Sequence, residues 1–303
     1  EETTEEETKG PGDPVDREKV ETHLIIASDT HYMSPSMTDY GAAFDSLVNS
    51  NDGKVIRYQP QLWQAFKSEV LAANPDALIL SGDLSLNGEK ANHLEFSEKL
   101  HEIEEAGVPV YVIPGNHDIN KPDAGEYFGD QRTDVESVTS EEFREIYADF
   151  GYNEAKSGAP DSLSYLVELN DTTWLMMLDT TVCEPENEVY GEIKEGTLEW
   201  MEECLKAAAK VPMEVMERAV SVMDDIEFLA LHGSRLAVSD AGVGIQGIRS
   251  ALLGAVLSVY INTKMMKDRE YAEEMNSQAE LLIRKGTEQA DRIYGIVLKA
   301  VRG

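Results

Sequence analysis

The chain has few cysteines, no excess of positive charge and no long apolar run. Its two cysteines, Cys183 and Cys204, are too few for a disulfide framework and so do not define a redox compartment. The 26 basic residues are outnumbered by 58 acidic ones, giving a net charge of −32. Such a surface repels nucleic-acid backbones and anionic membranes, so we expect no nucleic-acid partner. Uninterrupted apolar runs are shorter than the roughly 18 residues that a membrane span needs, so no membrane span is expected.

Charge is distributed unevenly along the chain. Residues 1–204 hold 45 acidic and 13 basic residues, whereas residues 205–303 hold 13 of each. This change predicts an acidic leader at 1–20, a first domain at 21–205 and a helical segment at 206–303. The leader is typical of a disordered spacer left after removal of an export signal. An exported or cell-surface location is therefore expected for the N-terminal domain, with a cytoplasmic location as the alternative.

Three short apolar stretches, at residues 24–28, 77–81 and 108–113, are typical of buried β-strands. Polar residues follow each stretch, and the carboxyl ends of neighbouring strands meet at one crevice. Carboxylate, imidazole and carboxamide groups together predict a site for divalent metal ions. The residues concerned are, in chain order, Asp29, His31, Asp83, Asn116, His117 and Asp118.

The metal-binding groups suit phosphoryl transfer. Two divalent cations roughly 3.5–4 Å apart can hold the attacking and leaving oxygens when one carboxylate bridges them. Asp83 is the candidate bridge. Asp29 and His31 would hold the first metal, and Asn116 would offer its amide oxygen to the second.

His117 is expected to act in catalysis rather than as a ligand. It would stabilise the developing charge or protonate the leaving group. Asp118, its neighbour in the chain, is predicted to fix the tautomer of His117, as an orienting carboxylate does for a catalytic base.

The motifs Asp29-x-His31, Gly82-Asp83 and Gly115-Asn116-His117-Asp118, in this order and after strands, resemble the calcineurin-like metallophosphoesterase family. The likeness runs from about Glu21 to about Leu205. It implies an α/β (α+β) sandwich of two mixed sheets flanked by helices. It also implies a phosphoester hydrolase that uses two divalent ions (Mn, Fe or Zn) and a metal-activated hydroxide, with small phosphoesters as substrates.

The sequence departs from this family downstream. Family members supply further histidines, one alone and then a Gly-His-x-His pair, but His232 is the only histidine after His117, and its context is typical of a helix end. The second sheet is expected to contain strands at 164–169 and 173–178, and its later strands are missing from the sequence. A truncated sandwich would expose an edge and an apolar face unless helices or a second chain cover them.

Residues 206–303 predict an all-α segment of three helices. The first is expected over 212–233, the second begins at a cap formed by Ser239 or Asp240, and the third covers about 268–301. The spacing in the first helix predicts a buried stripe of Val215, Ala219, Val222, Ile226 and Leu229.

This tail has its own likeness. Residues 211–215, 238–244 and 260–263 resemble the later half of formiminotetrahydrofolate cyclodeaminases, which are helical, dimeric folate enzymes. The early half of that family and its acidic catalytic residue are absent. Glycines at 242–247 match a dinucleotide-binding spacing, but no strand precedes them, so close helix packing is the better interpretation. Two resemblances in one chain predict a chimaeric fusion.

Three functions remain open at this point. The first is a phosphomonoesterase or phosphodiesterase. The second is a folate-binding remnant in the tail. The third is a non-catalytic assembly module, with a homodimer or larger assembly formed through the C-terminal helices.

Overall fold

The computed structural model describes two compact units. The residues described are 21–50, 54–170 and 173–303, so the acidic leader predicted at 1–20 lies outside them. Among the described residues, the first unit comprises those up to residue 158 together with those in 163–192, and the second comprises residues 159–162 with 193–303.

A three-stranded parallel sheet with strand order β1-β2-β3 lies at the centre of the first unit. Its strands are β1 (Leu24–Ala27), β2 (Ala77–Ser81) and β3 (Val110–Ile113), which confirms the three predicted strands. The register places Leu80 opposite Val112. Because all three strands run in the same direction, their carboxyl ends lie at one edge of the sheet.

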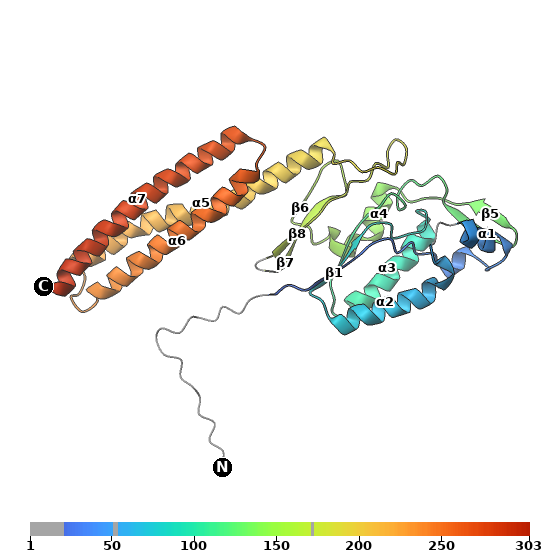
Figure 1. The fold of residues 1–303 in the computed structure, drawn as a ribbon, viewed down its shortest axis with the longest axis horizontal. Helices are drawn as coiled ribbons and strands as arrows, with labels where there is room; N and C mark the ends of the chain where they lie inside the picture. Colours follow the sequence, from blue (N-terminus) through green and yellow to red (C-terminus); the bar gives the residue numbers. More distant parts are fainter. Residues whose placement is uncertain (1–20, 51–53, 171–172) are drawn as a thin grey trace, which may run out of the picture. The chain divides into compact units, whose positions relative to one another are not determined.

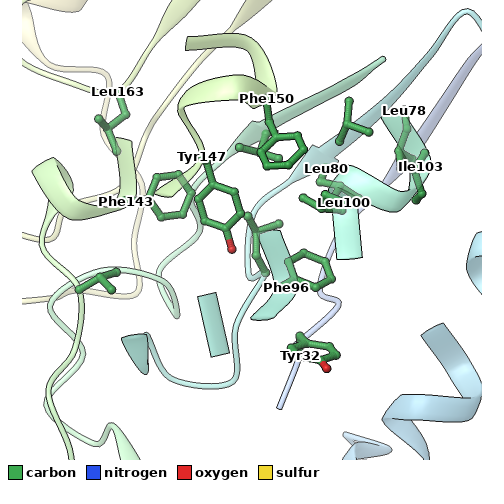
Figure 2. Close-up of a cluster of buried hydrophobic side chains, with 14 of the residues drawn as sticks. Tyr32, Leu78, Leu80, Phe96, Leu100, Ile103, Phe143, Tyr147, Phe150 and Leu163 are labelled. Atoms are coloured by element: carbon green, nitrogen blue, oxygen red, sulfur yellow. The ribbon is translucent and has the colours of Figure 1, made fainter. Parts of the chain in front are cut away.

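The two faces of this sheet are covered differently. Leu78 and Leu80 of β2 pack into a core with side chains from the helices, which Figure 2 shows in close-up. Ala77 and Ile79 point to the opposite face and pack against the second sheet. Helices α2 and α3 lie along the helical side (Figure 1). The helices of this unit are α1 (Ala42–Ser50), α2 (Gln59–Ala73), α3 (Lys90–Glu104) and α4 (Ser140–Ile146), with short turns η1 (Pro35–Met37), η2 (Ile56–Tyr58) and η3 (Ala148–Tyr152).

The second sheet is antiparallel, with order β6-β7-β8. Strands β7 (Tyr165–Asn170) and β8 (Thr173–Met177) confirm the prediction, and β6 (Ser157–Gly158) adds a short third strand. The predicted architecture of two packed sheets with flanking helices is therefore present. Apolar side chains remain exposed on both sheets, since Ile26 is 66% and Trp174 is 53% exposed. A separate hairpin is formed by β4 (Gly125–Phe128) and β5 (Gln131–Asp134).

The second unit is a bundle of three long helices: α5 (Glu195–His232), α6 (Val238–Met265) and α7 (Arg269–Arg302), which pack side by side (Figure 1). The predicted end of the first helix at Gly233 is confirmed, and His232 is its last residue. The predicted start at Pro212 is wrong, because α5 begins at Glu195 and Pro212 lies inside it. A proline ring removes one backbone donor but need not end a helix that packing stabilises. The predicted boundary between 205 and 206 thus falls within α5, and the division of the chain into domains stays a prediction.

The buried face of α5 also differs from the predicted stripe. Val215, Val222 and Leu229 are 43%, 42% and 50% exposed. The stripe prediction gave weight to branched side chains and none to methionine, whose flexible thioether fills the gaps between helices. The residues of α5 that line the bundle core are Ala209, Met213, Met216, Val220, Met223 and Ala230.

Helix α6 is largely apolar, with Asp240, Arg249 and Lys264 as its charged residues, and it contains the glycine-rich segment. A Cβ at Gly242 would come within 2.8 Å of Val297 Cγ1 on α7, which confirms that close helix packing explains this glycine. By length and composition alone, α6 could cross a membrane, and 28% of its most apolar window is buried. The sequence prediction missed this because it searched for uninterrupted apolar runs.

Two glycines of the bundle predict opposite effects of the same substitution. A Cβ at Gly286 would overlap Leu252 Cδ2 and approach Val220 Cγ2 at 3.1 Å, both within the buried core. Gly286→Ala should therefore destabilise the chain by about 1–3 kcal/mol. Gly254 has no neighbour within 4 Å of such a Cβ, so Gly254→Ala should stabilise by about 1 kcal/mol through helix propensity. Urea unfolding followed by circular dichroism measures both, and equal effects would contradict the packing described.

Candidate metal centre

The three predicted ligands Asp29, His31 and Asp83 lie at the tips of β1 and β2. All three have left-handed backbone conformations, with φ of 57°, 40° and 51°. Non-glycine residues rarely adopt such φ values, and they gather where the surrounding structure imposes them, often at functional sites. Hydrogen bonds between the two tips hold them in place, since His31 N donates to the Asp83 carbonyl oxygen at 2.9 Å.

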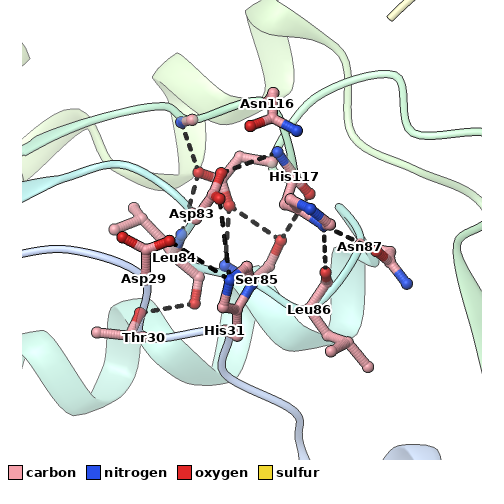
Figure 3. A network of polar contacts seen from close by, with 12 residues as sticks. Asp29, Thr30, His31, Asp83, Leu84, Ser85, Leu86, Asn87, Asn116 and His117 are labelled. Atoms are coloured by element: carbon pink, nitrogen blue, oxygen red, sulfur yellow. Dashed lines mark hydrogen bonds and ion pairs between the residues drawn. The ribbon is translucent and has the colours of Figure 1, made fainter. Parts of the chain in front are cut away.

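The side chains of these residues converge (Figure 3). Nε2 of His31 lies 3.7 Å from Asp29 Oδ1 and 3.8 Å from Asp83 Oδ2. One ligand atom from each residue lies within 4.8 Å of the others. These separations are too long for hydrogen bonds. They are close to the roughly 3–3.5 Å expected between neighbouring donors about 2.1 Å from one ion, so the donor set fits a divalent metal.

The protonation state of His31 also suits metal binding. The residue is 8% exposed, and burial lowers its pKa, with the charge of Lys54 acting in the same direction. Imidazole must be neutral to bind a metal. His31 is therefore in the binding-competent form at neutral pH.

The tips of β2 and β3 meet backbone to backbone. A Cβ at Gly82, whose φ is 103°, would lie 2.8 Å from the Gly115 Cα. A Cβ at Gly115 would overlap the Asp83 carboxylate. The two glycines let the loops approach closely, and His117 N then donates to Asp83 Oδ1 at 3.0 Å.

Asn116 and His117 lie on the β3 loop beside Asp83, as Figure 3 shows. Asn187 holds this loop by donating to the Asn116 carbonyl oxygen at 3.0 Å. Nδ1 of His117 lies 2.9 Å from two acceptors, the Leu86 carbonyl oxygen and Asn87 Oδ1. Nδ1 therefore carries the proton, and burial lowers the pKa of His117.

Asp118 has a different place from the one predicted. Its carboxylate is fully buried. It accepts from Leu84 N at 3.1 Å, Ser85 N at 2.8 Å and Gly115 N at 2.8 Å. The predicted orienting role is thus filled by Leu86 and Asn87, and Asp118 joins the two ligand loops. Burial raises the pKa of Asp118 to about 7, against the effect of these donors.

Two further residues at the site were not found from the sequence. Gln59, the first residue of α2, donates to the Thr30 and His31 carbonyl oxygens at 2.9 and 3.2 Å and so fixes the first ligand loop. Lys54 borders the same pocket as Asp29 and His31. Burial lowers the pKa of Lys54, while the charge of Asp83 raises it. Neither residue belongs to a motif, so no sequence signal points to them.

Parallel strands whose tips carry a candidate metal-binding group, packed on a second sheet, define an α/β sandwich, and comparison with known proteins identifies the family. The family model of calcineurin-like phosphoesterases matches residues 22–225, well over half of the chain. The chain belongs to that family. A second model, formiminotransferase-cyclodeaminase, matches residues 186–281.

Two curated relatives match the C-terminal part. One is the methenyltetrahydrofolate cyclohydrolase of Methylorubrum extorquens, 35% identical over 101 residues, which are 33% of this chain and 49% of that protein. The other is the formimidoyltransferase-cyclodeaminase of Gallus gallus, 25% identical over 108 residues, or 36% of this chain and 20% of that protein. The chain thus spans half or less of the relatives it matches. The two family matches overlap at residues 186–225, which include most of α5, from residue 195 to residue 225.

Proposed function

We propose that the first unit is a metal-dependent phosphoester hydrolase with a dinuclear centre. The observation that carries this proposal is the convergence of Asp29, His31 and Asp83, three donors that approach within 4.8 Å without hydrogen bonds to one another. Membership of the calcineurin-like phosphoesterase family supports the reaction class. We propose that the two metal ions are Mn, Fe or Zn.

The residues of the site have separate roles in this mechanism. Divalent ions supply Lewis-acid stabilisation of phosphoryl charge and lower the pKa of water. Asp29 and His31 would hold one ion, Asn116 would offer a neutral oxygen to the second, and Asp83 would be a ligand to both. Because Nδ1 of His117 donates to fixed acceptors, its Nε2 is the ring atom that would first take up a proton and then pass it to the leaving oxygen.

Charge also shapes substrate choice. The chain carries a net charge of −32, so an anionic ester approaches a repulsive surface. Bound cations and the Lys54 ammonium neutralise the site locally. Small phosphoesters, monoester or diester, are therefore the substrates we propose.

Metal loading should stabilise the protein and switch on activity. Protein purified without chelator is expected to contain two Mn, Fe or Zn ions per chain by elemental analysis. Adding metal at about 100 times its dissociation constant to the chelated protein should raise the stability by about 2.7 kcal/mol. Hydrolysis of para-nitrophenyl phosphate should appear with the same metal dependence. Absence of bound metal after saturation would reject the proposal.

We also propose that the helical unit assembles chains into a homodimer. The observation that favours this is a row of exposed apolar side chains one turn apart on α6: Leu257, Ile261 and Met265, which are 67%, 65% and 70% exposed. Exposed apolar patches of this kind mark interaction surfaces. A folate site is less well supported, because the pocket of about 260 Å³ between α5 and α7 contains Glu214, Glu217 and Glu274, which repel an anionic ligand.

Analytical ultracentrifugation tests this second proposal. The native chain should sediment as a dimer, and the pair Leu257→Glu and Ile261→Glu should give a monomer, because charges would be buried in the interface. Leu281→Glu on α7, where leucine is 55% exposed, is the matched control and should leave the dimer intact. A native monomer at all concentrations contradicts dimerisation. Flotation of the native chain with lipid vesicles would instead assign the row to membrane binding.

A further inference from the structure

A pocket of about 600 Å³ adjoins the metal centre and includes Asp29 and His31 in its wall. This volume lies in the usual range of small-molecule sites, roughly 300–1,000 Å³. The metal centre occupies one side of the pocket. The rest of the wall is mainly apolar and is formed by Val55, Leu62, Trp63, Phe66 and Phe96.

Aromatic rings form much of this wall. Trp63 lies 5.4 Å from Phe96, edge to face, and 5.8 Å from Phe66, measured between ring centroids. Leu62 and Phe66 lie one helical turn apart on α2, so they present one continuous surface. Phe66 is the partly exposed ring of the three, so contact with its face or edge favours a flat ring.

Trp63 also leaves a hydrogen-bond donor unused. The residue is 5% exposed, and among the described residues its buried Nε1 has no hydrogen-bond partner. A buried donor without a partner costs about 1–3 kcal/mol, so such groups are usually satisfied by water or a ligand. A purely aliphatic ligand would leave this cost in place, whereas a ligand whose acceptor reaches Nε1 would remove it.

We propose that the pocket binds the leaving group of the phosphoester, and that this group is an aromatic alcohol carrying a hydrogen-bond acceptor. The inference rests on the proposed hydrolase function and adds the substrate class. Hydrolysis adds water across the P–O bond, releasing the alcohol into the pocket and the phosphate at the metal centre. Lys54 borders both regions and offsets the charge of the phosphate.

Binding of the alcohol alone tests the pocket without any turnover. Methyl para-hydroxybenzoate has a ring and an ester acceptor, and para-propylphenol has a ring of similar size without the ester. The full metal-free chain contains three tryptophans, so its indole N–H resonances are few, and Trp63→Phe assigns that of Trp63. Methyl para-hydroxybenzoate should shift this resonance saturably and bind about fivefold to tenfold more tightly than para-propylphenol.

Three variants separate the pocket from general effects. Trp63→Phe keeps an aromatic ring but removes the donor, so in calorimetric titration it should abolish the preference for the ester. Leu62→Glu places a charge against the ring and should weaken binding of both alcohols at least about tenfold. Leu94→Glu on α3 is the matched control, because Leu94 is 48% exposed and Leu62 is 47% exposed, and it should bind both alcohols like the native chain. No saturable shift, or equal affinities in the two glutamate variants, would overturn the proposal.

Activity of the metal-loaded enzyme distinguishes the hydrolase function from the leaving-group pocket. The ratio of kcat/KM for the phosphate ester of methyl para-hydroxybenzoate to that for glycerol phosphate should fall about tenfold in Leu62→Glu and stay unchanged in Leu94→Glu. Alcohol binding without hydrolysis of either ester would contradict the hydrolase function but support a binding site for aromatic alcohols. If Leu62→Glu hydrolyses both esters with the native ratio of kcat/KM values, the leaving-group pocket is contradicted and the hydrolase function is supported.

Discussion

Asp83→Asn should abolish phosphoester hydrolysis, with kcat/KM falling by about 10³-fold or more. Loss of a residue that merely orients a ligand already costs 10–100-fold, and Asp83 is proposed as a direct ligand to both ions. Asparagine keeps the shape of the side chain and can still accept the bond from His117 N, so the loop should remain in place. The loss therefore reports the missing charge between the cations rather than a rearranged site.

Stability of the metal-free protein supplies the internal check. Asp29 and Asp83 both approach His31, and without a metal they repel each other. Asp83→Asn relieves this repulsion, so the melting temperature of the chelated variant should equal or exceed that of the chelated native chain. Elemental analysis of the Asp83→Asn variant, purified without chelator, should show fewer than two metal ions per chain. Asp130→Asn, at an exposed position, should retain native metal content and rate. Native activity in Asp83→Asn would exclude the proposed bridge.

The strands and their tips were predictable because two local signals coincide. Short apolar stretches such as 77–81 give buried strands, and a polar residue soon after the end of such a strand lies at its carboxyl edge. The convergence of Asp29, His31 and Asp83 follows from the parallel direction of the strands, which the chain order already suggests. The second sheet was expected from the family resemblance, which implied strands at 164–169 and 173–178, close to the observed β7 and β8.

The remaining features depend on tertiary contacts that no local pattern records. The role of Asp118 was mistaken because adjacency in sequence to His117 does not imply contact, and its carboxylate instead accepts backbone donors from the β2 and β3 loops. Gln59 reaches the loop after β1 from a helix that begins far along the chain. The start of α5 was misplaced because Pro212 is usual in a first turn, whereas packing carries the helix through it.

Gly115→Ala should disable the metal centre through a single methyl group. The backbone φ of Gly115 is not in the left-handed region, so alanine suits the local conformation. The added Cβ would nevertheless overlap both the carboxylate and the backbone nitrogen of Asp83, which cannot move away without shifting the β2 tip. A ligand displaced by about 1 Å costs roughly 10²-fold in rate, so kcat/KM should fall at least that far.

Gly107→Ala is the reciprocal control at the opposite end of β3. There φ is 95°, so alanine strains the backbone, but its Cβ would meet nothing within 4 Å. This variant should lose about 1–3 kcal/mol of stability while keeping its metals and its rate. Gly115→Ala should show the opposite pattern. Its metal affinity in calorimetric titration should fall strongly, whereas its stability should change less. Because the two substitutions are chemically identical and precede or follow the same strand, only the position of Asp83 accounts for the contrast. Equal metal affinity in both variants would show that the close approach of the β2 and β3 tips does not set the geometry of the centre.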